Sequence, residues 1–326
     1  MPPDTNGTTL PAFPRHGTIV DTAASEAGDD LMTSVTTIIG ILDKPALIPW
    51  AVNETADRLI DAPAKLLWYI ENEGPEAARR WIAGLRYATG GLLSDAARGT
   101  LLHALADQWM LLGFRPDVTP DLHPDYAAKG SVLLPADIAI LGRMLDQFDR
   151  VWLQQWQPEY IASEFVVFHD VFKYAGQVDA IVRINGKLYV IDYKTSKSTY
   201  TAGGKLKGVY PEIALQLSAY RHATHAAVYR VRRTERYRRR YYLLNPVERA
   251  EALPMPEVYG GMGVFISPDH LGVHAVRCDD DVFRVYCNLQ EVARWQHDWS
   301  DSCVGNPMSP PYPVDDDDPF AGLPQE

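Results

Sequence analysis

Residues 174–195 read YAGQVDAIVRINGKLYVIDYKT, and this stretch predicts a β-hairpin around which the fold is organised. Val, Ile and Tyr dominate both arms, and the dipeptide Asn185-Gly186 between them favours a two-residue type I′ turn. With that turn, Asp179 lies directly opposite Asp192 on the neighbouring strand. Lys194 shares the face of Asp192, because side chains alternate along a strand.

Two carboxylates that face each other across a hairpin repel one another unless a positive charge lies between them. A divalent metal ion meets that need, because hard cations prefer carboxylate oxygens. The hairpin therefore predicts a cation site formed by Asp179 and Asp192, with the ammonium group of Lys194 beside it. The alternative is a surface hairpin with solvated charges, one of them paired with Lys194.

The composition indicates a large globular protein. The chain has 326 residues, of which 46% are hydrophobic, and no apolar run long enough for a transmembrane helix. No signal pattern is visible at the N-terminus, so we expect a cytoplasmic protein without a membrane partner. Cys278, Cys287 and Cys303 fit no metal-binding spacing and are expected to be free thiols.

The pattern along the chain predicts one folded domain over residues 32–304, between a disordered lead-in (1–31) and an acidic disordered tail (305–326). An N-terminal helical region precedes the hairpin and is interrupted at Gly74-Pro75. Ser94 and Gly113 are the expected first and last capping residues of the next helix. The tail residues Asp315–Asp318 are interpreted as a solubility tail, a docking segment for a partner or a shield for basic residues.

Four motifs in a fixed order resemble those of the PD-(D/E)XK nuclease superfamily, and in particular its RecB-type exonuclease branch, which includes phage and CRISPR-associated members. They are R-G-T-x-x-H ending at His103, G-x-x-D ending at Asp179, I-D-Y-K-T around Asp192, and Q-x-x-x-Y from Gln216 to Tyr220. The resemblance covers roughly residues 33–245. It implies an α/β fold of the restriction-endonuclease type, with a mixed central sheet flanked by helices.

The resemblance also implies roles for the residues of these motifs. His103, Asp179 and Asp192 would hold one or two Mg²⁺ or Mn²⁺ ions, with the backbone carbonyl of Tyr193 as a further ligand. Lys194 would orient or deprotonate the attacking water, or neutralise charge that develops at phosphorus. A helical histidine without such a hairpin is more often structural.

Further residues are candidates for contacts with substrate or water. Glu164, in the pattern S-E-x-x-V, would bond a metal-bound water or Lys194, or it is a strand-edge carboxylate in solvent. Gln216 would bond a phosphate oxygen and Tyr220 would stack or bond, unless that ring packs on the core. A basic segment follows in which arginines track the DNA backbone or cover a solvated hairpin face: Arg230, Arg232, Arg233, Arg236 and Arg238.

The chain also departs from its relatives. The CRISPR-associated members hold an iron–sulfur cluster with four cysteines, whereas this chain has three, all after residue 277, so we expect no cluster. The sequence G-x-x-x-x-G-K-[ST] is absent, so we expect no ATP motor, and any helicase would be a separate chain. Val178 stands where the superfamily's name has proline.

Together these features predict a Mg²⁺-dependent deoxyribonuclease, an exonuclease of phage DNA recombination, repair or processing in the host cytoplasm. DNA is the expected partner, with a single-strand-binding or annealing protein or a helicase as further candidates. Two alternatives stay open: a non-cleaving DNA-binding or assembly module with the same fold, and an unrelated enzyme that shares the hairpin by chance. The sequence leaves polarity, strand preference, exonuclease against endonuclease action and oligomeric state to experiment.

Overall fold

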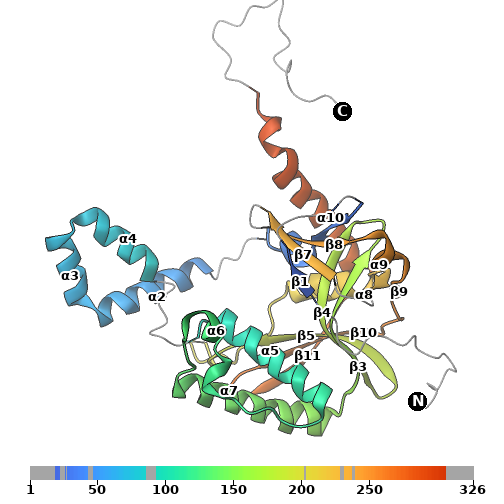
Figure 1. Ribbon diagram of the computed structural model, residues 1–326, viewed down its shortest axis with the longest axis horizontal. Coiled ribbons are helices and arrows are strands. Elements are labelled where there is room, and N and C mark those ends of the chain that lie inside the picture. Colours follow the sequence, from blue (N-terminus) through green and yellow to red (C-terminus); the bar gives the residue numbers. More distant parts are fainter. Residues whose placement is uncertain are drawn as a thin grey trace, which may run out of the picture.

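The fold is a mixed α/β arrangement in which helices flank a central mixed sheet, as the sequence predicts (Figure 1). The computed structural model describes residues 19–305 apart from 23–25, 27, 43–46, 86–92, 202, 228–230 and 237–238. The first part of the predicted lead-in and the acidic residues Asp315–Asp318 therefore lie outside the described residues.

The predicted hairpin consists of β4 (Tyr174–Ile184) and β5 (Lys187–Thr195). Asn185 and Gly186 between them have positive φ angles of 50° and 78°, as a type I′ turn requires. The antiparallel pairs run from Ile184 with Lys187 to Ala180 with Ile191. This is the register expected from the turn, so the prediction of the hairpin is confirmed.

The sheet extends from this hairpin in two directions. On one side of β4 lie β3 (Glu159–His169), β6 (His225–Ala226) and β9 (Leu253–Pro254). On its other side lie β2 (Asp30–Ser34), β8 (Arg239–Leu244), β7 (Val231–Arg236) and β1 (Ile19–Asp21). Strand β5 instead pairs in parallel with β10 (Gly260–Ile266), which continues into β11 (Leu271–Val276).

The sheet forks at the motif G-x-x-D. On one edge of β4, β2 pairs with Tyr174 and Ala175, whereas β5 pairs from Ala180 onward. Gly176–Asp179 therefore lies between two partner strands that diverge from each other. Figure 1 shows β5, β10 and β11 running away from β7 and β8 beyond this point.

Helices pack on both sides of the sheet over two apolar cores. One core lies under α5 (Asp95–Leu112), α7 (Pro135–Gln147) and the π-helical continuation of α7 (Phe148–Trp156). The other lies under α1 (Val35–Ile39), α8 (Ile213–Arg221) and α10 (Asp280–Arg294). Shorter turns of helix are α6 (Tyr126–Lys129), α9 (Pro246–Ala250), Pro120–Leu122, Trp295–Trp299 and Ser300–Cys303.

The N-terminal helical region is set apart from the sheet in Figure 1. It comprises α2 (Leu47–Asp61), α3 (Pro63–Asn72) and α4 (Pro75–Leu85), and Gly74, with φ at 83°, separates the last two as predicted. The rings of Tyr69 and Trp81 stack at 5.3 Å between α3 and α4. A helix with the length and apolar character needed to cross a bilayer does not occur among the described residues.

The range expected to be a disordered lead-in contains described secondary structure at its C-terminal end. Ile19–Asp21 forms β1, which runs parallel to β7, and Asp30 begins β2. Ion pairs accompany this pairing, because Asp21 contacts Arg233 at 2.8 Å and Asp29 contacts Arg232 at 2.5 Å. The arginines lie some two hundred residues further along the chain. The composition of residues 1–31 alone therefore could not predict this pairing.

Candidate active site

A cavity of about 690 Å³ opens at the fork of the sheet. Strands β3, β4 and β5, helices α5 and α8, and the β7–β8 hairpin all contribute to its walls. The residues lining it include seven that were predicted for the catalytic and metal site or for the Q-x-x-x-Y motif: His103, Glu164, Asp179, Asp192, Lys194, Gln216 and Tyr220. The motifs, which are scattered over more than a hundred residues, therefore meet in one place.

Helix α5 delivers His103 to this cavity. Ser94 accepts a hydrogen bond from the backbone N–H of Ala97, and Gly113 ends the helix with φ at 76°, as predicted. Gly99 allows the helix to approach β5, since a Cβ atom there would lie 2.9 Å from Oγ1 of Thr195. The imidazole is thereby held against the end of the β4–β5 hairpin.

A buried ion pair fixes the orientation of α5. The guanidinium of Arg98 lies 3.2 Å from Asp137 at the start of α7, and both side chains are almost fully buried. The same guanidinium donates to the carbonyl of Leu93 at 2.8 Å. Arg98 belongs to the motif R-G-T-x-x-H, so its place in the motif is explained by packing.

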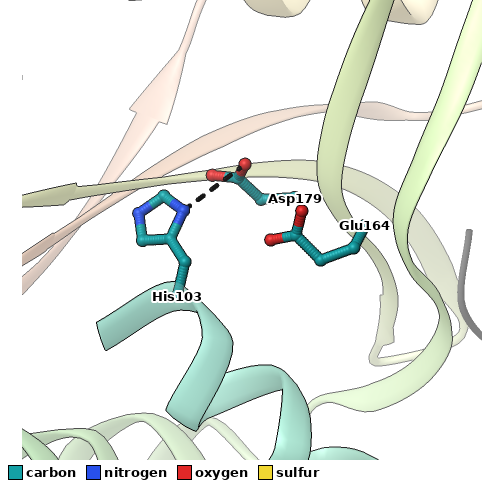
Figure 2. Close-up of side chains that lie close together, drawn as sticks. All are labelled: His103, Glu164 and Asp179. Carbon is teal, nitrogen blue, oxygen red and sulfur yellow. Dashed lines mark ion pairs between the residues drawn. The ribbon is translucent and has the colours of Figure 1, made fainter. Parts of the chain in front are cut away.

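His103, Glu164 and Asp179 form the tightest group of metal-ligating side chains in the described residues. One ligand atom from each lies within 4.8 Å of the others. Figure 2 shows His103 on α5 and Glu164 on β3 both directed toward Asp179 on β4. Nδ1 of His103 is 3.7 Å from Oδ1 of Asp179.

The ring of His103 is oriented by the neighbouring strand. Its Nε2 lies 3.1 Å from the carbonyl oxygen of Tyr193, which can only accept a hydrogen bond. The proton is therefore on Nε2, and Nδ1 keeps a lone pair directed toward the carboxylates. Second-shell bonds of this kind fix the tautomer of histidines that bind metals.

Where β4 and β5 separate, the side chain of Asp179 accepts a hydrogen bond from the backbone of β5. Its Oδ2 accepts from the backbone N–H of Tyr193 at 2.7 Å. The other oxygen, Oδ1, faces His103. One carboxylate therefore holds the fork in place and also contributes to the group of ligand atoms.

Glu164 occupies a strained position opposite Asp179. Its φ of 49° is unusual for a residue with a side chain, and such outliers concentrate at functional sites. Burial, and to a lesser degree the charges of Asp179 and Asp107, raise the pKa of its carboxyl to about 8. The side-chain amide of Gln177 donates a hydrogen bond to the carboxylate.

Asp192 and Lys194 form a second group on the side of the cavity nearer α8. The ammonium nitrogen of Lys194 lies 2.6 Å from the almost fully buried carboxylate of Asp192. Burial raises the pKa of Asp192 to about 6, although Lys194 acts in the opposite direction. Burial alone would lower the pKa of Lys194, but the charges of Asp192 and Asp179 outweigh it and raise that pKa, so the side chain is an ammonium ion.

These side chains fit a divalent cation. The carboxyl groups of Glu164, Asp179 and Asp192 converge in the cavity with the imidazole of His103, and oxygen and nitrogen ligands of this kind suit Mg²⁺ or Mn²⁺. The grouping differs from the predicted metal ligands. Glu164 takes the place in it that was predicted for Asp192, and the carbonyl of Tyr193, predicted as a further ligand, lies against Nε2 of His103.

The Q-x-x-x-Y motif contacts the β4–β5 hairpin directly. Gln216 donates to Oδ1 of Asp192 at 2.7 Å and to the hydroxyl of Tyr220 at 3.1 Å. The ring of Tyr220 is buried against Gly176, where a Cβ atom would lie 2.4 Å from Cε1 of the ring. The glycine of G-x-x-D and the tyrosine of Q-x-x-x-Y therefore require each other, and only the tyrosine hydroxyl end reaches the cavity.

The two arginines of the predicted patch whose side chains are described are paired with acidic residues. Arg232 contacts Asp29 at 2.5 Å, and Arg233, which lines the cavity, contacts Asp21 at 2.8 Å. Arg230 and Arg238 lie outside the described residues, as does the side chain of Arg236. The concentration of positive charge expected from the sequence is thus reduced at Arg232 and Arg233.

Several cavity residues were not predicted. Asp107 lies one helical turn after His103 and accepts a hydrogen bond from Ser163, next to Glu164. The spacing H-x-x-x-D on one helix face could have identified it. Thr36 and Arg240 also line the cavity, but no sequence pattern brings them together.

Comparison with known proteins agrees with this geometry. The family model of the PD-(D/E)XK nuclease superfamily matches residues 76–303, which is more than half of the chain. The chain belongs to the PD-(D/E)XK nuclease superfamily. Nucleases of this superfamily use divalent metal ions, in keeping with the ligand group of His103, Glu164 and Asp179.

Comparisons with curated proteins and with solved structures add little to this assignment. None of the curated proteins matches this sequence. One solved structure, described as the crystal structure of SSO0001, is 16% identical, with 61% of this chain and 86% of that chain covered and a TM-score of 0.28. A likeness at this level carries no argument about function.

Proposed function

We propose that this PD-(D/E)XK protein is a divalent-metal-dependent deoxyribonuclease that uses Mg²⁺ or Mn²⁺. The observation that supports it most is the convergence of His103, Glu164 and Asp179 within 4.8 Å of one another, in the same cavity as Lys194. A site that only bound DNA would have no use for three carboxyl groups beside a histidine, one of them buried and two partly buried, since carboxylates repel phosphate.

In this proposal His103, Glu164 and Asp179 hold the ion, and Asp192 lies next to them. A bound divalent ion would lower the pKa of a coordinated water and polarise the scissile phosphate. The hydrogen bond from His103 to Tyr193 keeps Nδ1 available, and the bond from Tyr193 to Asp179 keeps the carboxylate in place. These two contacts reduce the reorganisation needed when the ion binds.

Lys194 acts in this proposal as a fixed positive charge. Because its pKa is raised by Asp192 and Asp179, it is protonated at neutral pH and suited to neutralise charge that develops on the phosphate. Its contacts with Asp192 at 2.6 Å and Gln216 at 3.4 Å place the ammonium group. Of the roles predicted from the sequence, charge neutralisation and orientation of water fit best.

The finer assignments rest on the order of the four motifs. They favour the RecB-type branch, hence an exonuclease in phage DNA recombination, repair or processing, with action in the host cytoplasm. A single-strand-binding or annealing protein, or a separate helicase, would be its partner in that role. Gln216 and Arg233, which line the cavity, are the candidates for substrate contact that are best placed for it.

The test is digestion of linear, circular and single-stranded DNA in the presence and absence of Mg²⁺. We expect Mg²⁺-dependent loss of linear DNA from its ends, with circular DNA resistant, and no cleavage by the Asp179→Asn variant. Cleavage of circular DNA would assign an endonuclease instead. DNA binding without cleavage by the wild-type protein, in either Mg²⁺ or Mn²⁺, would favour the non-cleaving module.

A further inference from the structure

We propose that Arg240, with the hydroxyl groups of Ser34 and Thr36, forms a subsite for a backbone phosphate of the DNA strand, next to the phosphate that lies at the metal ligands. This inference rests on the proposed function, because it concerns how the same cavity holds its substrate. It places part of the strand between β8 and α1, a route that no sequence motif indicates.

Three cavities meet at Arg240. The catalytic cavity of about 690 Å³ adjoins two others of about 540 Å³ each. One shares Thr36 and Arg240 with it, and the other shares Arg233 and Arg240. The hollow surface therefore continues past Arg240 away from the metal ligands, as a bound strand longer than one nucleotide requires.

Arg240 differs from the neighbouring arginines of the β7–β8 hairpin because it forms no ion pair with a carboxylate of the described residues. Arg232, Arg233 and Arg239 contact the carboxylates of Asp29, Asp21 and Asp298 at 2.5, 2.8 and 3.2 Å. Arg240 is exposed, and none of the carboxylates in the described residues forms an ion pair with it. Its guanidinium is therefore free to bind an anion, and guanidinium groups bind phosphate in a bidentate manner.

Glu235 does not neutralise this charge in the structure. It is the residue opposite Arg240 in the β7–β8 ladder, and it lines the two outer cavities. Although the two side chains share one face of the hairpin, no ion pair connects them. Asp21, the partner of Arg233, lines one of these cavities as well, and the charge of Arg240 helps to lower its pKa. A phosphate would thus have to compete with two exposed carboxylates, which costs little in solvent.

Hydroxyl groups beside Arg240 complete the subsite, since β2 pairs with β8 at this point. Ser34 and Thr36 line the catalytic cavity with Arg240, and their hydroxyl oxygens are 2.8 Å apart. The backbone N–H of Arg240 donates to Oγ1 of Thr37 at 3.0 Å, which ties the start of β8 to α1. Arginine and Ser or Thr hydroxyls are the usual partners of DNA phosphate oxygens.

The charges of the cavity are separated in a way that suits one strand. Carboxylates gather at the fork, around Asp179, and bind phosphate only through a cation. Arg240 lies where this cavity adjoins the two outer ones, and binds phosphate directly. A strand that spans the cavity would place one phosphate at each end, so that Arg240 aligns the scissile bond from its neighbour.

The proposal is tested with oligonucleotides that carry a single neutral methylphosphonate linkage, moved one position at a time. Binding is measured by fluorescence anisotropy with Mn²⁺, in a Lys194→Ala background that prevents cleavage, on single strands and duplexes. One linkage should matter most, and its neutralisation should weaken binding about tenfold, as expected for a charge-assisted hydrogen bond. With Arg240→Ala the same linkage should no longer matter, while the other linkages keep their effects.

Thr36→Val should reduce the effect of the same linkage without abolishing it. Arg284→Ala is the matched control, since Arg284 is an exposed arginine of α10 that is paired with Asp281. An unchanged linkage profile in Arg240→Ala, or an equal loss in Arg284→Ala, would overturn the subsite while leaving the nuclease assignment intact. Failure of the parent protein to bind any of the oligonucleotides would overturn both.

Discussion

The β4–β5 and β7–β8 hairpins belong to the same sheet and have two-residue connections. They differ in how far their own sequence decides what their side chains can do. In β4–β5 the alternation and the turn determine which side chains share a face, so Asp179, Asp192 and Lys194 could be placed in advance. In β7–β8 the same logic locates the arginines but not their free charge, because Asp21 and Asp29 neutralise Arg233 and Arg232. The local sequence pattern determines where side chains lie, whereas the charge that an arginine can offer to a ligand depends on acidic residues far away in the chain.

The largest effect is expected at the first hairpin. Replacing Lys194 by Ala removes the ammonium ion beside Asp192, and we expect the rate of DNA cleavage to fall by about a thousandfold. The measurement is single-turnover cleavage in Mg²⁺, with folding checked by circular dichroism. Lys205→Ala, at an exposed lysine of the following loop, should cleave normally. Full activity of Lys194→Ala would contradict the assigned role.

In the second hairpin the largest effect should be on stability. Arg232→Met leaves the carboxylate of Asp29, whose side chain is 2% exposed, buried without its partner, and should lower the free energy of unfolding by about 3 kcal/mol. Arg233→Met should cost only about 0.5 kcal/mol, because its partner Asp21 is exposed. Urea denaturation measures both. Equal losses of unfolding free energy in the two variants would show that the burial of Asp29 does not make its ion pair more important than that of Asp21.

The contact between G-x-x-D and Q-x-x-x-Y can be tested by adding one methyl group. Gly176→Ala places a Cβ atom where the ring of Tyr220 lies, and should lower the free energy of unfolding by about 2 kcal/mol. Gly142→Ala, in the interior of α7 with no heavy atom near its Cβ position, should instead raise it by up to about 1 kcal/mol. Thermal unfolding would show opposite signs. A neutral Gly176→Ala variant would contradict the packing.

The smallest expected effect concerns pH. Because the pKa of Glu164 is raised to about 8, a cation must displace its proton at neutral pH. For one such proton, the affinity for Mn²⁺ should increase about fivefold between pH 7 and pH 8. The metal-free protein should lose stability as pH rises toward 8, since its unfolded chain holds fewer protons than the folded one.

Calorimetric titration with Mn²⁺ at both pH values provides the check. In Glu164→Gln the carboxyl is replaced by a group that does not ionise, so we expect weaker binding with less pH dependence. An affinity of the wild-type protein that is the same at pH 7 and pH 8 would exclude Glu164 as the proton-linked ligand.

The sequence predicted the register of the β4–β5 hairpin and the helix that carries His103 from short-range signals, and the fold class from the resemblance of four motifs to a known superfamily. It did not reveal that Glu164, with its positive φ, joins His103 and Asp179, since that requires β3 to lie beside β4 in a specific register. Arg240 and Thr36 meet only because β8 pairs with β2 next to α1. Contacts between distant strands therefore account for most of what the sequence could not provide.

The most direct test of the metal site is an anomalous-difference map from crystals soaked in Mn²⁺. We predict a peak between Nδ1 of His103 and the carboxylates of Glu164 and Asp179, with Lys194 nearby but not coordinated. A peak at another place, or none at a Mn²⁺ concentration that supports cleavage, would contradict the assignment of this group as the catalytic metal ligands.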